Sequence, residues 1–231
     1  MESVKEIYRL DDEFESEETA RYVKPFMFIK GFAAGRRLPQ TQLALSLARR
    51  LHEGQRRLDG QPYLTHPLTV CSALISYGID DDVTLAAALL HDTLEDCADK
   101  LPLGGRELVV EYGLDPEVLE LVRMLTKQSG LDDQQLSAYF KRIESDPRAA
   151  LVKLSDRLHN SSTLYTFTYP KMRKYLRETD KFLIPMGSYC KKYYPTYSNA
   201  FSILKREIES LNQSMGAMLE KLDGGGEKRA L

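Results

Sequence analysis

The four histidines of the chain fall within three short segments that also carry its most unusual charged residues. These segments read HEGQRRLDGQPYLTHP at 52–67, ALLHDTLED at 88–96 and VKLSDRLHN at 152–160. An imidazole or a charged group inside an apolar helical pattern is costly unless it is paired, hydrogen-bonded or bound to a metal ion. Their concentration in so few residues predicts one buried site that attracts a cation.

Two imidazoles and two carboxylates from these segments are suitable ligands for a divalent metal ion. The predicted ligands are His66, His91, Asp92 and Asp156. A mixed nitrogen and oxygen set suits manganese, iron or another borderline-hard divalent cation, and it disfavours metals that prefer thiolates. The alternative, a set of ordinary core residues, requires several unrelated buried charges. We interpret His52 and His159 as packing or hydrogen-bonding neighbours of this site.

Glu95 and Asp96 extend the acidic character of the second segment. If residues 83–96 form one helix, Glu95 lies one turn after His91, and Asp96 lies one turn after Asp92. Carboxylates at these positions could orient an attacking water or accept its proton. The competing interpretation is a solvated helix C-terminus, although acidic groups there oppose the helix dipole.

Helical periodicity dominates the chain and predicts an all-α protein, a helical bundle with the metal site in its core. We expect helices at 43–51, from 66 to about 78, at 83–96, 116–126 and 132–143, from 149 onward, and at 199–222. The LDGQP stretch at 58–62 breaks the first of these, so a turn precedes Tyr63, whose ring packs beside His66. The last helix is expected to pack on the domain, with a coiled-coil homodimer as the open alternative.

The overall composition excludes several classes of partner. The 231 residues include 32 basic and 34 acidic side chains, a formal net charge of −2, which lacks the basic excess typical of nucleic-acid binding. No apolar run follows a basic start in the first thirty residues, so we expect no signal peptide, no membrane span and a cytoplasmic location. Cys71, Cys97 and Cys190 form no CxxC pair, which argues against a disulfide framework or a thiolate zinc site.

The chain is long enough for one catalytic domain with helical extensions. We predict a helical N-terminal extension at 1–39, the main domain at 40–190, a C-terminal helical extension packed on it at 191–223, and a flexible tail at 224–231. Neither an internal repeat nor a low-complexity tract interrupts this organisation.

In order, spacing and residue type, the three segments resemble the hydrolase domain of the RelA/SpoT family. The stretch RETDKFLIPMG at 177–187 is similar to the helix that follows in that family. The resemblance covers residues 40–190 and implies an HD-type helical fold. It also implies a manganese-dependent enzyme that removes pyrophosphate from the 3′ position of the alarmone (p)ppGpp and returns GDP or GTP.

Position by position, the resemblance implies the same four metal ligands, and it makes Glu95 and Asp96 the acidic pair that handles water. It implies that Arg57 meets the substrate near that pair, and that Asn160 and Thr163 contact the nucleoside. A guanidinium offers a planar fork for phosphate oxygens, although an isolated arginine in HEGQRR could equally be solvated. Because only about forty residues follow the matched region, too few for a synthetase domain, we expect a small stand-alone alarmone hydrolase.

Two departures from the family pattern leave alternatives open. Ser161 and Ser162 stand where the family usually has methionine and arginine, and Leu58 stands where many relatives have lysine. An adenosine alarmone, (p)ppApp, or another nucleotide is therefore an alternative substrate for the same metal chemistry. The second alternative is a protein that binds the alarmone or neutralises a partner synthetase without turnover. The complete acidic pair argues against that second alternative.

Overall fold

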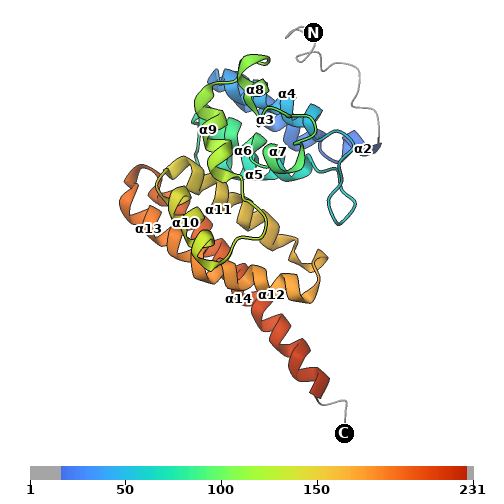
Figure 1. Ribbon diagram of the computed structural model, residues 1–231, viewed down its shortest axis with the longest axis vertical. Coiled ribbons are helices and arrows are strands. Elements are labelled where there is room, and N and C mark those ends of the chain that lie inside the picture. Colours follow the sequence, from blue (N-terminus) through green and yellow to red (C-terminus); the bar gives the residue numbers. More distant parts are fainter. Residues whose placement is uncertain (1–16, 228–231) are drawn as a thin grey trace.

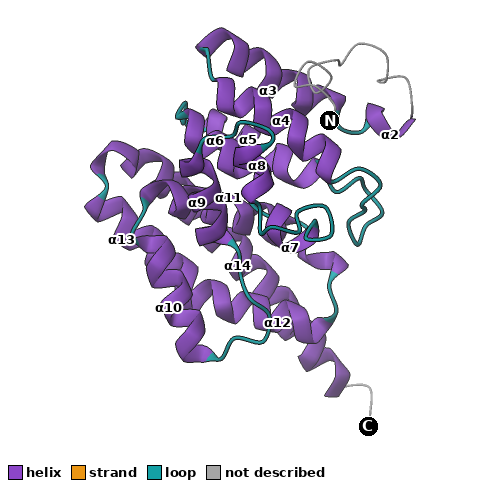
Figure 2. Ribbon diagram, turned by 45° about the horizontal axis from the view of Figure 1, so that its top comes forward, coloured by secondary structure: helices purple, strands orange, loops and turns teal. Residues whose placement is uncertain are grey.

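The computed structural model describes residues 17–227, and this part of the chain is built from helices (Figure 1). Apart from an isolated bridge between Arg56 and Pro62, these residues contain no strand pairing (Figure 2). The predicted all-α fold is therefore confirmed.

The helices follow one another with short connections. The first half of the chain forms α2 (Glu17–Ala20), α3 (Val23–Arg36), α4 (Pro39–Leu51), α5 (Thr65–Ser76), α6 (Asp82–Leu90), α7 (Thr93–Asp96), α8 (Arg106–Val110) and α9 (Pro116–Leu125). The second half forms α10 (Asp133–Glu144), α11 (Pro147–Ser162), η1 (Leu164–Thr166), α12 (Tyr169–Glu178), the π-helical η2 (Thr179–Leu183), α13 (Ile184–Tyr193), η3 (Pro195–Tyr197) and α14 (Ser198–Glu227). The helices predicted from periodicity correspond to α4, α5, α9, α10, α11 and α14.

Helix α6 lies at the centre of the main core. Its residues from Thr84 to Leu90 are all buried, as expected for a helix that is apolar on every side. Helices α4, α5, α9 and α11 pack around it. Polar groups at the end of α6 therefore lie in the interior of the protein.

Aspartate caps set the start of the helices that follow. Asp115 and Asp146 each accept a backbone N–H at the start of α9 and α11, and each precedes a proline at the first helical position. Asp132 forms a complete capping box with Gln135 at the start of α10. Such caps each contribute about 1 kcal/mol, so the starts of these three helices are well specified.

The single helix predicted over 83–96 is wrong in one respect, because the chain forms two helices there. The His91 ring approaches the carbonyl of Ala88 at 2.9 Å, and the Thr93 hydroxyl donates to the carbonyl of Leu90 at 2.7 Å. In a continuous helix these two carbonyls would accept the N–H groups of residues 92 and 94. Side chains thus compete with the backbone for the same acceptors and interrupt the helix at the site.

Both terminal segments contribute to the main core. Helix α3 adds Phe26 and Ile29, and α14 adds Phe201 and Leu204. Helix α14 then extends away from the body of the molecule (Figure 1) and runs to Glu227, into the stretch predicted as a flexible tail. Residues 1–16 and 228–231 lie outside the described part of the chain, and the predicted domain boundaries remain predictions.

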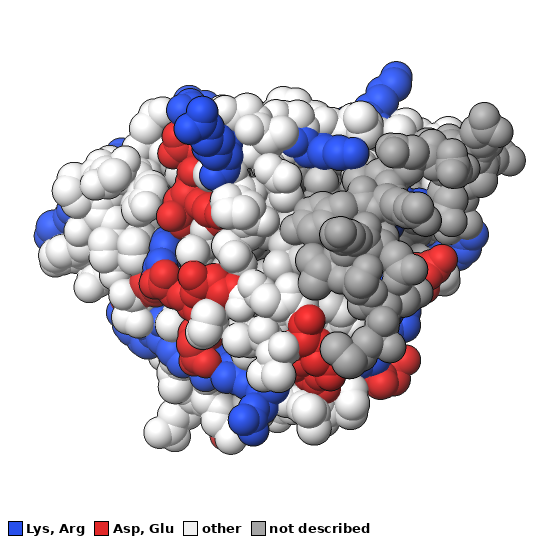
Figure 3. Space-filling model, turned by 90° about the horizontal axis from the view of Figure 1, so that it is seen from above, with Lys and Arg blue, Asp and Glu red and all other residues white. Residues whose placement is uncertain are grey.

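The surface carries both signs of charge. On the end of the molecule seen in Figure 3, lysine and arginine lie next to aspartate and glutamate, and neither sign covers the described part of that face. Among the described residues, no helix has the length and apolar character needed to cross a bilayer.

Candidate metal centre

Three helices that pack against one another bring the predicted metal ligands together. The first turn of α5 provides His66, the end of α6 provides His91 and Asp92, and the middle of α11 provides Asp156. The two imidazoles are buried, with exposed fractions of 1% and 2%. Residues separated by about ninety positions in sequence therefore meet in one interior site.

The donor atoms of the four residues lie around Nε2 of His66. The Nε2 atom of His66 lies 3.2 Å from Nε2 of His91, 3.3 Å from Oδ2 of Asp92 and 3.2 Å from Oδ1 of Asp156. The Nε2 atom of His91 lies 3.2 Å from Asp92 Oδ2 and 3.8 Å from Asp156 Oδ1. Neighbouring ligands of one cation bound at about 2.1 Å lie about 3 Å apart. The donor atoms of His66, His91 and Asp92 lie within 4.8 Å of one another and could hold a single divalent cation, whereas Asp156 lies outside that group and faces it through His66.

The charge of the site also favours a cation. Although burial alone would lower the pKa of His91, Asp92 and Asp156 raise it to about 10. Burial alone would raise the pKa of both carboxyl groups, but the imidazoles, together with Lys153 beside Asp156, hold each pKa well below its usual value. The two carboxylates thus draw positive charge into the interior, and a divalent cation would supply it.

Hydrogen bonds at the far side of each imidazole leave its Nε2 atom facing the site. His91 directs Nδ1 to the backbone carbonyl of Ala88, and His66 directs Nδ1 to Nδ1 of His159 at 2.6 Å. His159 also stacks on His66 with 4.9 Å between ring centroids. His159 is thus a hydrogen-bonding and packing neighbour of a predicted ligand, in agreement with the sequence interpretation.

Tyr63 has a closer relation to the site than the sequence predicted. Its hydroxyl donates to Oδ2 of Asp92 at 2.6 Å, and its ring stacks on His52 with 4.8 Å between centroids. Burial first, and then the charges of Asp92 and Asp96, raise the pKa of Tyr63. The hydroxyl therefore stays protonated and fixes the orientation of a predicted ligand, while Gln55 holds His52 at 2.7 Å.

The two carboxylate oxygens of Asp156 have different partners. Oδ1 faces His66, whereas Oδ2 accepts a hydrogen bond from Nζ of Lys153 at 2.9 Å. Asn160 donates from Nδ2 to Oδ1 of Asp156. Sequence reasoning missed Lys153, although a lysine three residues before an aspartate on a buried helix was a usable signal.

The three predicted substrate contacts lie together beside the metal ligands. Nη2 of Arg57 donates to Oδ1 of Asn160 at 3.1 Å and to the hydroxyl of Thr163 at 3.2 Å. Asn160 therefore bridges Arg57 and Asp156. The arrangement holds a guanidinium next to the cation site, where it could bind an oxyanion.

The acidic pair follows the metal ligands on the short helix α7. Glu95 accepts a hydrogen bond from the backbone N–H of Lys127 at 2.5 Å, and burial raises the pKa of its carboxyl group. The backbone carbonyl of Asp96 accepts a bond from Gln55 at 2.8 Å. A carboxyl group whose pKa is raised by burial accepts a proton more readily than a solvated carboxyl group.

Comparison with known proteins identifies related sequences. Residues 44–187 match the family described as HD domain. A guanosine-3′,5′-bis(diphosphate) 3′-pyrophosphohydrolase of Aquifex aeolicus (strain VF5) is 38% identical over 153 residues, which cover 64% of this chain and 21% of that protein. The bifunctional (p)ppGpp synthase/hydrolase SpoT of Escherichia coli (strain K12) is 30% identical over 207 residues, which cover 80% of this chain and 29% of that protein. The chain thus spans less than a third of the length of either relative.

A solved structure has the same fold. It is a metazoan ortholog of SpoT, described as hydrolysing ppGpp and acting in starvation responses. The TM-score is 0.60 at 24% sequence identity, and the match covers 77% of this chain and 96% of that one. The helical arrangement around the site is therefore shared with a protein of known structure.

Proposed function

The chain belongs to the HD domain family, and from that premise we propose that it is a metal-dependent 3′-pyrophosphohydrolase of (p)ppGpp. The products would be GDP or GTP and pyrophosphate. The observation that carries the proposal is the convergence of two imidazoles and two carboxylates next to Arg57, Asn160 and Thr163. The names of the relatives from Aquifex aeolicus and Escherichia coli support the substrate.

We assign His66, His91, Asp92 and Asp156 to one divalent cation, with manganese as the proposed ion because the donors are nitrogen and oxygen atoms. The mutual proximity of His66, His91 and Asp92 supports the first three ligands, and the 3.2 Å between Asp156 Oδ1 and His66 Nε2 supports the fourth. A bound divalent cation makes water more acidic and offsets negative charge on a phosphoryl oxygen. Tyr63 and His159 keep two of the ligands oriented.

The chemistry then requires one proton acceptor and one anion contact from the protein. In the proposed reaction, water oxygen bonds to the phosphorus that carries the 3′ oxygen, and the bond from that phosphorus to the 3′ oxygen breaks. One proton of the water passes to Glu95 or Asp96, the water oxygen becomes part of the departing pyrophosphate, and the carboxyl group returns that proton to the 3′ oxygen, which ends as a hydroxyl group. Arg57 neutralises charge on the diphosphate, and Asn160 and Thr163 hold its guanidinium in place.

Leu58 bears on which base the nucleotide carries. Leu58, next to Arg57, is 70% exposed and has no charge with which to stack over a purine. This observation favours testing an adenosine alarmone beside the guanosine compound. A cytoplasmic location, a homodimer and a partner synthetase remain predictions of the sequence.

The deciding experiment uses metal-stripped protein with (p)ppGpp or (p)ppApp, to which manganese is added back while products are separated by chromatography. We expect manganese-dependent release of pyrophosphate from the guanosine compound. Release from the adenosine compound alone would keep the chemistry and overturn the base. Binding of either compound without turnover, under any divalent metal, would favour a binding protein. Glu95→Gln and Asp96→Asn are the matched variants, and unchanged turnover in both would remove them from the mechanism.

A further inference from the structure

Glu95 is held by a part of the chain that lies outside the helix carrying it. Its carboxylate accepts the backbone N–H of Lys127, 32 residues further along the chain. Lys127 lies in the connection between the end of α9 at Leu125 and the start of α10 at Asp133. The position of this connection therefore determines where the carboxylate of Glu95 points.

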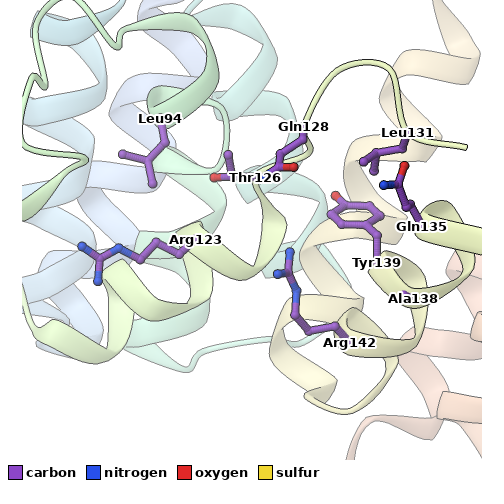
Figure 4. A pocket seen from close by; sticks show the side chains of 9 residues that line it. All are labelled: Leu94, Arg123, Thr126, Gln128, Leu131, Gln135, Ala138, Tyr139 and Arg142. Atoms are coloured by element: carbon purple, nitrogen blue, oxygen red, sulfur yellow. The ribbon is translucent and has the colours of Figure 1, made fainter.

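The side chains of this connection are half-buried or exposed. A cavity of about 500 Å³ lies there, and the side chains of Thr126, Gln128 and Leu131 line it (Figure 4). Leu94, the neighbour of Glu95, lines the same cavity. Leu131 packs partly against the core but residues 128–130 are exposed, so packing restrains this stretch of backbone only in part.

The side chain of Lys127 supplies a different anchor. Its Nζ atom lies 3.0 Å from Oε2 of Glu178 at the end of α12, and Oε1 of Glu178 lies 2.5 Å from Nη2 of Arg157. Arg157 is 3% exposed, lies on α11 next to Asp156, and stacks 3.6 Å from the centroid of the Tyr175 ring. Through Arg157, the anchor at the end of α12 is thus tied to α11, the helix that also carries the predicted metal ligand Asp156.

Both side chains of this ion pair are partly buried. The side chains of Lys127 and Glu178 are 28% and 10% exposed. Burial lowers the pKa of Lys127. Burial alone would raise the pKa of Glu178, but the charges of Arg157 and Lys127 outweigh it and lower that pKa. Such a pair is screened less by solvent than a surface pair and restrains the lysine backbone more firmly.

We infer that Lys127 and Glu178 are positioning residues that hold Glu95 at the proposed reaction centre through the backbone N–H of residue 127. This inference rests on the proposed function only in giving Glu95 a role in handling water. Neither side chain needs to touch the substrate. The ion pair between Lys127 and Glu178 holds the connection in place, and the backbone N–H of residue 127 then holds the carboxylate of Glu95.

The test compares Lys127→Met with Lys127→Arg. Methionine keeps the backbone N–H and much of the apolar stem but removes the charge, whereas arginine keeps a cation that can pair with Glu178. We expect Lys127→Met to lower kcat on the order of 10- to 100-fold, as for a misplaced catalytic group, with KM nearly unchanged and partial recovery in Lys127→Arg. Lys181→Met is the control, because it removes an exposed lysine that pairs with Asp133 at 2.6 Å.

A double-mutant cycle separates action through Glu95 from a direct role. In a Glu95→Gln background, Lys127→Met should cause little further loss of kcat, because the group that it positions is already neutral. A full additional loss, a rise in KM alone, or an effect no larger than that of Lys181→Met would overturn the inference.

Hydrogen exchange at the amide of residue 127 gives a readout that needs no turnover. We expect at least roughly tenfold faster exchange in Lys127→Met than in the wild type, because the bond to Glu95 is weakened, and no such change in Lys181→Met. Absence of turnover in the wild type would contradict the proposed function. The exchange rates would still decide whether Lys127 holds Glu95. Unchanged exchange in Lys127→Met would overturn the inference, whatever the activity of the wild type.

Discussion

His66 and His159 face each other through their Nδ1 atoms, which lie 2.6 Å apart, with the two rings stacked. Only one of these nitrogens can carry the proton of the hydrogen bond. Burial, followed by the charges of His66 and Arg57, lowers the pKa of His159 to about 3, so His159 is neutral at pH 7. His159 can therefore accept the Nδ1 proton of His66, which leaves Nε2 of His66 free to bind a metal ion.

Replacing the acceptor should weaken metal binding without unfolding the protein. We expect His159→Leu to lower the affinity for manganese by roughly 10- to 100-fold, as is typical when the partner of a metal-binding histidine is lost. His159→Asn retains an acceptor oxygen and should retain more of the affinity. Titration calorimetry on the metal-stripped variants measures both values. Equal affinity in the wild type and His159→Leu would contradict the assigned hydrogen bond.

The hydrogen bond from Tyr63 to Asp92 should likewise strengthen metal binding, here by orienting a carboxylate ligand. Tyr63→Phe removes the hydroxyl that donates to Asp92 at 2.6 Å but keeps the ring that stacks on His52. We expect roughly tenfold weaker manganese binding and a proportionate loss of turnover at low metal concentration. Tyr77→Phe is the matched control, because its hydroxyl bonds to Glu207 at 2.7 Å and α5 carries it away from the site. An equal effect of the two substitutions would argue against a special role for Tyr63.

Much of the fold and the principal residues of the site could be predicted from sequence. Helical periodicity and Asp-Pro starts such as Asp146-Pro147 are local features, and they indicate a helix whatever the arrangement of its neighbours. Likewise, His91 and Asp92 stand out because burying a charge at the end of the apolar helix α6 costs free energy unless the charge is paired or bound to a metal ion. Such signals lie within a single element and require no knowledge of the elements around it.

Contacts between elements could not be predicted in this way. The bond from Tyr63 to Asp92 joins a loop to the end of α6, and the bond from Lys127 to Glu95 joins two segments 32 residues apart. The helix break at His91 was missed for a related reason. The imidazole meets the carbonyl of Ala88, only three residues earlier, through Nδ1, while His66 of α5 and Asp156 of α11 lie against its other nitrogen.

The arginine beside the metal site should govern substrate affinity. Thr163→Val keeps the shape of the side chain but removes the hydroxyl that accepts from Arg57 at 3.2 Å. We expect KM for (p)ppGpp to rise several-fold, roughly the effect of one hydrogen bond of about 1 kcal/mol, with kcat largely retained. Thr69→Val, which removes an exposed hydroxyl bonded within α5, should leave KM unchanged. A fall in kcat alone would place Thr163 in a different role.

Metal removal should also change the stability of the fold. A ligand that binds only the folded state at 100 times its Kd adds about 2.7 kcal/mol to the free energy of unfolding. Manganese at that concentration should therefore raise Tm by several degrees, and a chelator should reverse the rise. His66→Ala, which removes the donor closest to all the others, should abolish the metal-dependent shift. A shift that persists in His66→Ala would mean that manganese binds elsewhere.

The start of α11 offers a test of stability that is independent of the metal. Asp146 accepts the backbone N–H of Arg148 and also pairs with its guanidinium at 2.8 Å. Burial alone would raise the pKa of Asp146, but these hydrogen bonds outweigh it and hold the pKa below its ordinary value. Arg148 also reaches Glu117 at 2.8 Å, so the interaction ties α11 to α9.

Asp146→Asn keeps a side chain that can cap the helix but removes the charge, and we expect it to lower the free energy of unfolding by about 1 to 2 kcal/mol at pH 7. Because the pKa of Asp146 is lower in the folded state than its unfolded value of about 3.9, the stabilisation is complete above that pH. It is lost as the pH falls from about 3.9 through the folded pKa. Urea unfolding from pH 7 downward should therefore show wild type and variant converging only in acid, whereas a constant difference at every pH would show that charge is not the cause.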